Sequence, residues 1–250
     1  MTRIEVLDHG HVELIGSMGS DLDIVNGARQ SFDEVSILHR NDCPLMVAFD
    51  APSECNCANT GGVNLLPKDA GLVNFLMREK HTSPFELVTA KLGVMLPIFV
   101  AREWMRHRTQ SFNEMSARYT QMPRLFYVPE DIREQKGKPG AYYYEPMADR
   151  VMAVRARQRI EAMCNVAFDE YEYLMSEGVA KEQARLVLPV GTYTKMVVSA
   201  NLLNWMRFLS LRNHEHAQYE IRVYAEAIEK LLMEIAPVAM EKFVEHGRLR

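Results

Sequence analysis

Residues 88–96 form the most regular pattern in the chain, because apolar side chains recur there at every second position. The alternating residues are Val88, Ala90, Leu92, Val94 and Leu96. A period of two places such residues on one face of a strand. Pro97 follows directly, and proline is tolerated in the first turn of a helix, where its missing N–H would have no partner. The sequence therefore predicts a strand over 88–96 and a helix over 98–108.

Shorter runs of the same period flank a turn near the N-terminus. The Asp8-His9-Gly10 segment separates apolar residues at 4–6 from apolar residues at 12–14, a pattern typical of a β-hairpin. Residues 21–32 favour a short helix. Residues 41–66 are rich in Pro, Gly, Asn and Cys with little periodicity, which predicts a long surface loop or an insertion.

The second half of the sequence favours helices. Apolar residues recur at helical spacing over 151–174, and Gly178 suits the left-handed position after a helix. We expect further helices over 181–188, 193–211 and 221–235, while the Lys/Gly/Pro-rich segment 134–140 resembles a bridge. The sequence thus predicts one α+β domain over 1–250, with an early antiparallel sheet, an insertion near 41–66 and a helix-rich C-terminal half.

Charge and hydropathy exclude some classes of protein. The chain has 29 Lys+Arg and 33 Asp+Glu, a net charge of −4, which argues against a protein that coats nucleic acid by bulk positive charge. Charged residues interrupt the N-terminus, and no run of 18 apolar residues occurs. We therefore expect no secretory signal, no membrane segment and a cytoplasmic location.

Three of the four cysteines, Cys43, Cys55 and Cys57, crowd into one stretch. They could bind a metal, but no zinc-type CxxC pair is present, so thiols in a reducing compartment are favoured and no metal is expected. The segment His214-Glu215-His216 lacks the i, i+4 spacing of an HExxH zinc site. The remaining histidines outside the motifs are expected at the surface: His9, His11, His39 and His246.

Fourteen residues, RHRTQSFNEMSARY at 106–119, concentrate charged and hydrogen-bonding side chains. Successive helix residues point about 100° apart, so Arg106, His107 and Arg108 cannot share one face and would meet two or three anionic groups. The alternative is a solvated helix end followed by a capping box from Ser111 to Glu114. The residues alone leave both interpretations open.

The same segment matches the pattern R-H-R-x-x-S-x-N-E-x-S-x-R-Y of the flavin-dependent thymidylate synthases at all nine specified positions. The likeness extends to HTSPFE at 81–86, PIFVAR at 97–102, ARLVLP at 184–189 and LR at 211–212 followed by HAQ at 216–218. The chain therefore resembles that family over most of its length.

The resemblance implies an enzyme that makes dTMP from dUMP. In that family, 5,10-methylenetetrahydrofolate gives the carbon, NADPH reduces a tightly bound FAD, and the reduced flavin supplies hydride. The family forms homotetramers with active sites shared between subunits, and its methyl transfer needs no protein nucleophile. Ser116 is accordingly expected to donate or accept a hydrogen bond, since a nucleophilic serine requires a positioned base.

The resemblance also assigns residues. Arg212 corresponds to the catalytic arginine that faces the pyrimidine and stabilises its N3-deprotonated form. The implied dUMP site comprises Glu103, Trp104, Met105, Arg106, Glu114, Met115, Ser116, Ala117, Arg118, Arg185 and Arg212. The implied FAD site comprises His81, Ser83, Arg106, His107, Arg108, Glu114, Asn201, Leu202, Leu203, Arg207 and His216.

Three positions depart from the family pattern. Glu103 stands where some members have Gln, Arg207 where Asn or His can occur, and Leu203 where a polar FAD contact can occur. Trp104 and Trp205 favour a packing role over flavin stacking. Two other functions stay open: an RNA- or nucleotide-binding module that uses the 106–118 cluster, and an inactive homologue.

Overall fold

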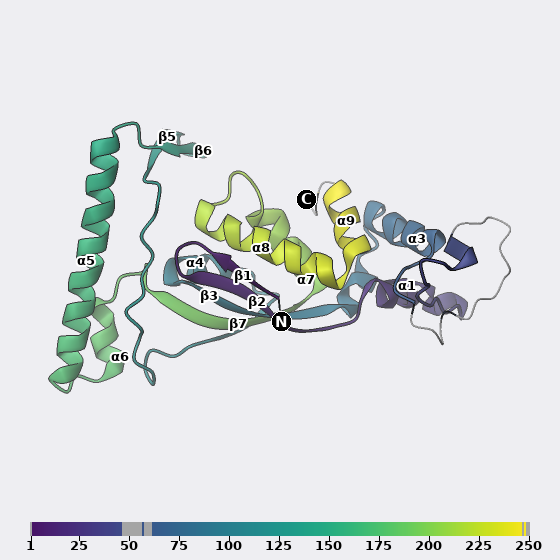
Figure 1. The fold of residues 1–250 in the computed structure, drawn as a ribbon, viewed down its shortest axis with the longest axis horizontal. Coiled ribbons are helices and arrows are strands. Elements are labelled where there is room, and N and C mark those ends of the chain that lie inside the picture. The colour runs from purple at the N-terminus through teal and green to yellow at the C-terminus, as the bar shows by residue number, and fades with distance from the viewer. Residues whose placement is uncertain (1, 47–56, 58–61, 247, 249–250) are drawn as a thin grey trace.

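The computed structural model describes residues 2–46, 57, 62–246 and 248. Cys55 and much of the expected insertion lie outside the described residues. The chain has the predicted α+β fold, with an antiparallel sheet in the order β1-β2-β3-β7-β4 and helices packed against it (Figure 1). A separate hairpin, β5-β6, stands apart from this sheet. Among the described helices, none is long and apolar enough to cross a bilayer.

The N-terminal elements largely confirm the sequence prediction. β1 (Arg3–Val6) and β2 (Gly10–Met18) form the expected hairpin, and β3 (Thr89–Pro97) is the expected strand. α1 (Asp21–Arg29) runs into η1 (Gln30–Phe32). Three elements were not expected from the sequence: η2 (Pro44–Met46), α3 (Pro67–Arg78) and η3 (Ser83–Leu87).

The helix predicted over 193–211 is wrong in its first half. β7 (Tyr193–Asn201) is a strand, and α7 (Leu202–Arg212) begins only after it. Met196, Val198 and Ala200 alternate with exposed residues, and β7 pairs with β3 along its whole length and with β4 on its other edge. Two partner strands satisfy the backbone of β7, so sheet pairing overrides the helical spacing of the sequence.

The helix predicted over 98–108 is also too long. α4 (Ile98–Trp104) ends early, and β4 (Ser111–Glu114) is an edge strand rather than a capping box. The buried side chain of Gln110 accepts a 2.8 Å hydrogen bond from the indole N–H of Trp104. The backbone turns between the helix and the strand, where the amide of His107 donates to Trp104 O at 3.0 Å and the amide of Gln110 donates to His107 O at 3.2 Å, so most of the motif lies on a turn and a strand.

An excursion over 115–192 leaves the sheet after β4 and returns as β7. It contains β5 (Arg133–Lys138), β6 (Ala141–Pro146), α5 (Arg150–Ser176), α6 (Lys181–Ala184) and η4 (Arg185–Val187). The expected bridge over 134–140 is therefore wrong, because these residues form a hairpin with glycines at positive φ. The ends of the excursion meet, since Glu114 pairs with Met196 and the amide of Met115 donates to Lys195 O at 2.8 Å.

The excursion has a small core of its own. Met122, Phe168, Tyr171 and Ala184 are buried together, and Met115 and Ala117 of the motif pack against them. α5 confirms the long helix predicted before Gly178, which adopts φ +84°. Figure 1 shows α5 and α6 standing at one end of the molecule, away from α1 and α3.

The main core lies between the sheet and the C-terminal helices. α7, α8 (Tyr219–Ile235) and α9 (Pro237–Glu245) supply many of its apolar side chains, and the strands, α1, α3 and α4 supply most of the others. Trp104 and Trp205 are fully buried and lie against Phe208, which confirms their packing role. The buried carboxylate of Asp21, on α1, accepts from the amides of Val238 and Ala239 at 2.8 and 2.9 Å and caps α9.

Candidate functional site

Arg212 is the last residue of α7, and its side chain is held by Glu103 on α4 and by His107 just after α4. Its Nε donates to His107 Nε2 at 2.9 Å, its Nη1 contacts the Glu103 carboxylate, and its Nη2 donates to the Glu103 backbone carbonyl at 3.4 Å. Both side chains of the ion pair are partly buried. Since all three guanidinium nitrogens are bonded, the plane of Arg212 is held in one orientation.

His107 is neutral near pH 7. Burial, followed by the positive charge of Arg212, lowers the pKa of His107 to about 4. Its Nε2 accepts from Arg212, so the proton of the neutral ring is on Nδ1. The ring edge packs against Phe208. His107 therefore serves as an acceptor for Arg212 without adding charge.

Arg106 and Arg108 flank His107 and are both exposed. Within the described part of the chain, neither makes an ion pair or a side-chain hydrogen bond. Two guanidinium groups without protein partners, next to a fixed Arg212, form an anion-accepting surface. This arrangement favours a ligand-binding interpretation of the motif over a solvated helix end.

The glutamate and serine of the motif lie at the sheet edge and just beyond it. Glu114, on β4, accepts a 2.8 Å hydrogen bond from the hydroxyl of Thr194 on β7. Asn113, Glu114 and Met115 line a hollow together with residues of β2, β3 and β7. Ser116 Oγ accepts from the amide of Arg118 at 3.4 Å. No described histidine or lysine contacts Ser116, which supports a hydrogen-bonding role.

A second pair of arginines meets at one carboxylate. Arg118 Nε lies 3.2 Å from Glu182 Oε2, and Arg185 Nε donates to the Glu182 backbone carbonyl at 3.3 Å. Arg118, Glu182 and Arg185 are all exposed. The small core of the excursion therefore brings together two arginines that are 67 positions apart in the sequence and that the resemblance assigns to dUMP.

The residues implied for FAD are spread over several elements. Asn201, at the start of α7, donates to Glu86 at 3.3 Å, and Arg207 donates to Asn204 at 3.1 Å. Exposed side chains at the surface complete this set: His81, Ser83 and His216. In contrast, the side chains of three implied site residues are buried in the core: Trp104, Leu202 and Leu203. Met105 packs against the same core.

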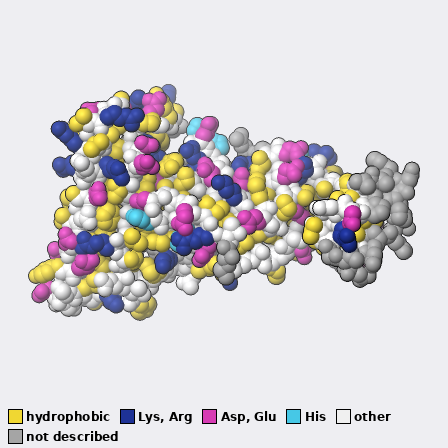
Figure 2. Space-filling model, viewed as in Figure 1, with side chains coloured by type: hydrophobic (Ala, Val, Ile, Leu, Met, Phe, Trp, Pro, Cys, Tyr) yellow, Lys and Arg dark blue, Asp and Glu magenta, His cyan; other side chains and the backbone are white. Residues whose placement is uncertain are grey.

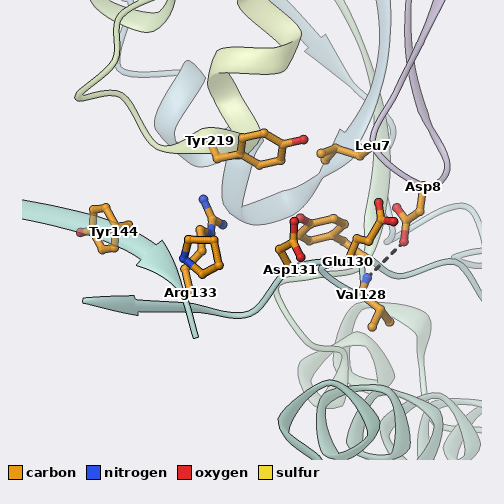
Figure 3. A pocket seen from close by; sticks show the side chains of 10 residues that line it. Leu7, Asp8, Val128, Glu130, Asp131, Arg133, Tyr144 and Tyr219 are labelled. Carbon is orange, nitrogen blue, oxygen red and sulfur yellow. Dashed lines mark hydrogen bonds between the residues drawn. The ribbon is translucent and has the colours of Figure 1, made fainter. Parts of the chain in front are cut away.

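A different hollow, of about 370 Å³, lies beside the hairpin β5-β6 (Figure 3). Leu7 and Tyr219 line one side, and Asp8 accepts a 3.1 Å hydrogen bond from the amide of Val128 across it. Arg133 in this hollow is already paired with the buried Glu220. None of the residues implied for dUMP or FAD lines it, so this hollow is separate from the motif.

Sequence reasoning missed the acidic and hydroxyl partners of the site. Thr194, Glu182 and Glu86 contact predicted residues through tertiary structure alone. Two of these three lie inside or close to quoted segments, since Glu86 ends HTSPFE and Glu182 stands two positions before ARLVLP. Their contacts, however, depend on sheet pairing and on the excursion, which carry no local signal.

Comparison with known proteins identifies the family. Residues 13–238 match the family Thy1, described as thymidylate synthase complementing protein. The flavin-dependent thymidylate synthase of Thermus thermophilus is 38% identical over 244 residues, covering 97% of this chain and 78% of that protein. The chain belongs to the flavin-dependent thymidylate synthase family. The enzyme of that name from Thermotoga neapolitana is 35% identical, with 98% of this chain and 95% of that protein covered.

Solved structures of a similar protein support the same fold and the same family. The UMP/dUMP methylase PolB from Streptomyces cacaoi, bound with 5-Br UMP, has a TM-score of 0.76 and 37% identity, covering 98% of this chain and 97% of that one. The same protein bound with 5-Br dUMP has a TM-score of 0.75 and 38% identity. The α+β fold and the membership in the flavin-dependent thymidylate synthase family are therefore shown by independent comparisons.

Proposed function

We propose that this chain synthesises dTMP by reductive methylation of dUMP, with the carbon from 5,10-methylenetetrahydrofolate and reducing equivalents from NADPH by way of FAD. The observation that carries this proposal is the fixed Arg212 guanidinium, bonded to Glu103 and to the neutral His107 beside two arginines without protein partners. Such a group suits a substrate whose ring becomes anionic during the reaction.

Arg212 is proposed to hold the N3-deprotonated pyrimidine. A guanidinium stays charged at every working pH, so it stabilises an anion without itself titrating. Its Nε and Nη1 are occupied by His107 and Glu103, while the bond of Nη2 to a carbonyl at 3.4 Å is long. The Nη2 edge is therefore the edge offered to the substrate. Glu103 offsets part of the charge of Arg212 and orients it.

Arg118 and Arg185 are proposed to bind the phosphate of dUMP, with Arg106 as a further cation. Fork-shaped guanidinium donors suit a phosphate better than point charges do. The Glu182 carboxylate now bonded to Arg118 is exposed, so a phosphate can displace it at small cost. The Ser116 hydroxyl and the backbone amides of Ser116 and Ala117 would add neutral donors at the same place, while the amide of Met115 already donates to Lys195 O.

The side chains implied for FAD fit such a cofactor by their chemistry. Arg106, Arg108 and Arg207 supply cations for a pyrophosphate or for a reduced, anionic ring, and Ser83 and Asn201 supply neutral donors. All five lie at the surface or partly exposed. The cofactor, when bound, supplies the hydride for the methyl group. Leu202 and Leu203 have buried side chains, and the amide of Leu202 already donates to Val88 O at 2.7 Å, so neither side chain is available to the cofactor.

Self-association is part of the proposal, as a homotetramer with shared active sites. α5 exposes an apolar set of side chains: Val151, Met152, Val154, Ile160, Met163, Val166 and Tyr173. Figure 2 shows apolar side chains exposed among charged ones at the end of the molecule that α5 forms. Several large apolar side chains exposed on one helix are typical of an interface between protein copies.

The decisive assay is tritium release from C5-labelled dUMP in the presence of FAD, NADPH and methylenetetrahydrofolate. The purified protein should be yellow and should release tritium only with all three present. Arg212→Ala should abolish release while retaining flavin, whereas Arg3→Ala, a control at an exposed arginine of β1, should not change it. A protein that neither retains nor takes up FAD would exclude the proposal.

UMP is a second candidate substrate, because the similar PolB is described as a UMP/dUMP methylase. The two nucleotides differ only at the 2′-hydroxyl. The same assay with C5-labelled UMP separates the two activities, and we expect dUMP to have the higher kcat/KM. A higher value with UMP would reassign the substrate without changing the family or the cofactor.

A further inference from the structure

A histidine and two cysteines gather in the described part of the expected insertion. The donor atoms of His39, Cys43 and Cys57 all lie within 4.8 Å of one another. These residues are only 4%, 3% and 5% exposed. The expectation that His39 lies at the surface is wrong, because its backbone is bridged to Asn64 and its side chain is enclosed with the two cysteines.

Hydrogen-bonded turns hold these three residues in place. The amide of His39 donates to Asn64 O at 2.7 Å, and the amide of Asn64 donates back at 2.9 Å. The amide of Cys43 closes a turn onto Arg40 O at 3.0 Å, and the carbonyl of Cys57 accepts from Gly62 at 3.4 Å. The backbone therefore presents the three donors from a defined frame, as a binding site requires.

The separation of the donors fits a tetrahedral zinc ion. His39 Nδ1 lies 3.4 Å from Cys43 Sγ. Bond lengths of about 2.0–2.1 Å to nitrogen and about 2.3 Å to sulfur place two such ligands about 3.6 Å apart across a tetrahedral angle. Imidazole and thiolate ligands select zinc over magnesium or calcium, which prefer oxygen.

We propose that His39, Cys43 and Cys57 bind a structural zinc ion. Two thiolates and a neutral imidazole around a divalent cation give a site with no net charge, which suits its deep burial. Three protein ligands leave one tetrahedral position for another donor. Cys55 lies outside the described residues and takes no part in the proposal. The proposal replaces the expectation, based on spacing alone, that these thiols serve no metal.

The position of the site indicates a structural role. It precedes α3 and lies at the end of the molecule opposite α5 (Figure 1), and the residues assigned to dUMP and FAD are not among its ligands. Between residues 39 and 57, the regular structure of the described residues consists of the bridge at His39, the short helical turn η2 and the helical position of Cys57 itself. When a metal ion binds such a segment, the free energy of binding stabilises its folded conformation.

The test uses the full-length protein produced with zinc in the medium and purified without chelator. Mass spectrometry of the metal content should find about one zinc per chain. Cys43→Ser and Cys57→Ser should each lose most of it, whereas Cys164→Ser, which removes another buried thiol on α5, should keep it. Zinc retained in both serine variants would overturn the assignment.

Cobalt provides a readout that does not depend on folded variants. Adding CoCl2 to the metal-stripped, reduced wild-type protein should give the visible bands of tetrahedral Co²⁺ and a near-ultraviolet thiolate-to-cobalt band. ZnCl2 should abolish both. A wild-type protein that carries no zinc and binds neither ion, or one in which peptide mapping finds Cys43 and Cys57 joined in a disulfide, would refute the proposal.

Discussion

Removing one hydroxyl from Tyr171 tests whether the small core holds residues 116–122, which include Ser116 and Arg118, in place. The Tyr171 hydroxyl accepts a 3.1 Å hydrogen bond from the amide of Met122, and both residues are buried. Met122 belongs to the stretch that follows Ser116 and Arg118, so this bond fixes the stretch to α5. Tyr171→Phe keeps the ring and its packing but leaves a buried N–H without a partner.

The expected cost follows from the burial of that amide. An unsatisfied buried donor costs about 1–3 kcal/mol, which lowers the Tm by roughly 2–4 °C per kcal/mol in a chain of this size. The clearest assay is hydrogen exchange of the Met122 amide. Because 1.4 kcal/mol is a factor of ten, its exchange should be about 5- to 150-fold faster in Tyr171→Phe.

A matched control lies two residues further along the same helix. Tyr173 is 57% exposed, and its hydroxyl makes no hydrogen bond among the described residues. Tyr173→Phe should leave the Met122 amide and the Tm unchanged. If Tyr171→Phe folded normally and Met122 exchanged at the wild-type rate, the hydroxyl would not hold this stretch, and the reasoning would be refuted.

Three further predictions concern the site and the frame that supports it. Glu103→Gln removes the negative charge that offsets the charge of Arg212. Because a partly exposed ion pair is worth up to about 1 kcal/mol, dUMP should bind up to about fivefold tighter, as measured by calorimetry. Unchanged or weaker binding would contradict the role given to Glu103. Because the folded-state pKa of His107 is about 4 against an ordinary 6.5, the unfolded chain takes up a proton between these values and stability falls as pH drops through that window. His107→Gln should therefore lose less stability than the wild type between pH 7 and pH 5 in denaturant titrations, while the exposed His246→Gln should behave like the wild type. Asp21→Ala removes the cap of α9 and should reduce the free energy of unfolding by about 0.5–2 kcal/mol. Hydrogen exchange of the Val238 and Ala239 amides should then be faster than in the wild type.

The sequence correctly predicted the elements whose residue spacing fits only one kind of secondary structure. The alternation over 88–96 fits only a strand, and the long helix before Gly178 carries its own end signal. β7 was missed because its apolar residues fit both periods, and the choice is made by β3, whose residues lie about a hundred positions earlier. Local pattern contains no information about such a partner.

The candidate site, too, could be predicted only in part from the sequence. The arginines of 106–118 stand out in the sequence as a dense cluster, whereas the groups that orient them do not. Glu103 lies 109 positions from Arg212 and contacts it only because α4 and α7 pack together around the tryptophans. The end of α4 and the start of β4 were misjudged because the Trp104–Gln110 bond, which holds the turn between them against α4, is a contact between buried side chains.

The excursion over 115–192 leaves the sheet from β4 and re-enters it on the neighbouring strand β7, where Glu114 and Met196 face each other. A segment whose entry and exit coincide can change in length without altering the register of the sheet. Closing a flexible loop costs only about 0.6 kcal/mol more for each doubling of its length. Evolution can therefore lengthen, shorten or exchange this arm while the sheet that carries Glu114 stays fixed.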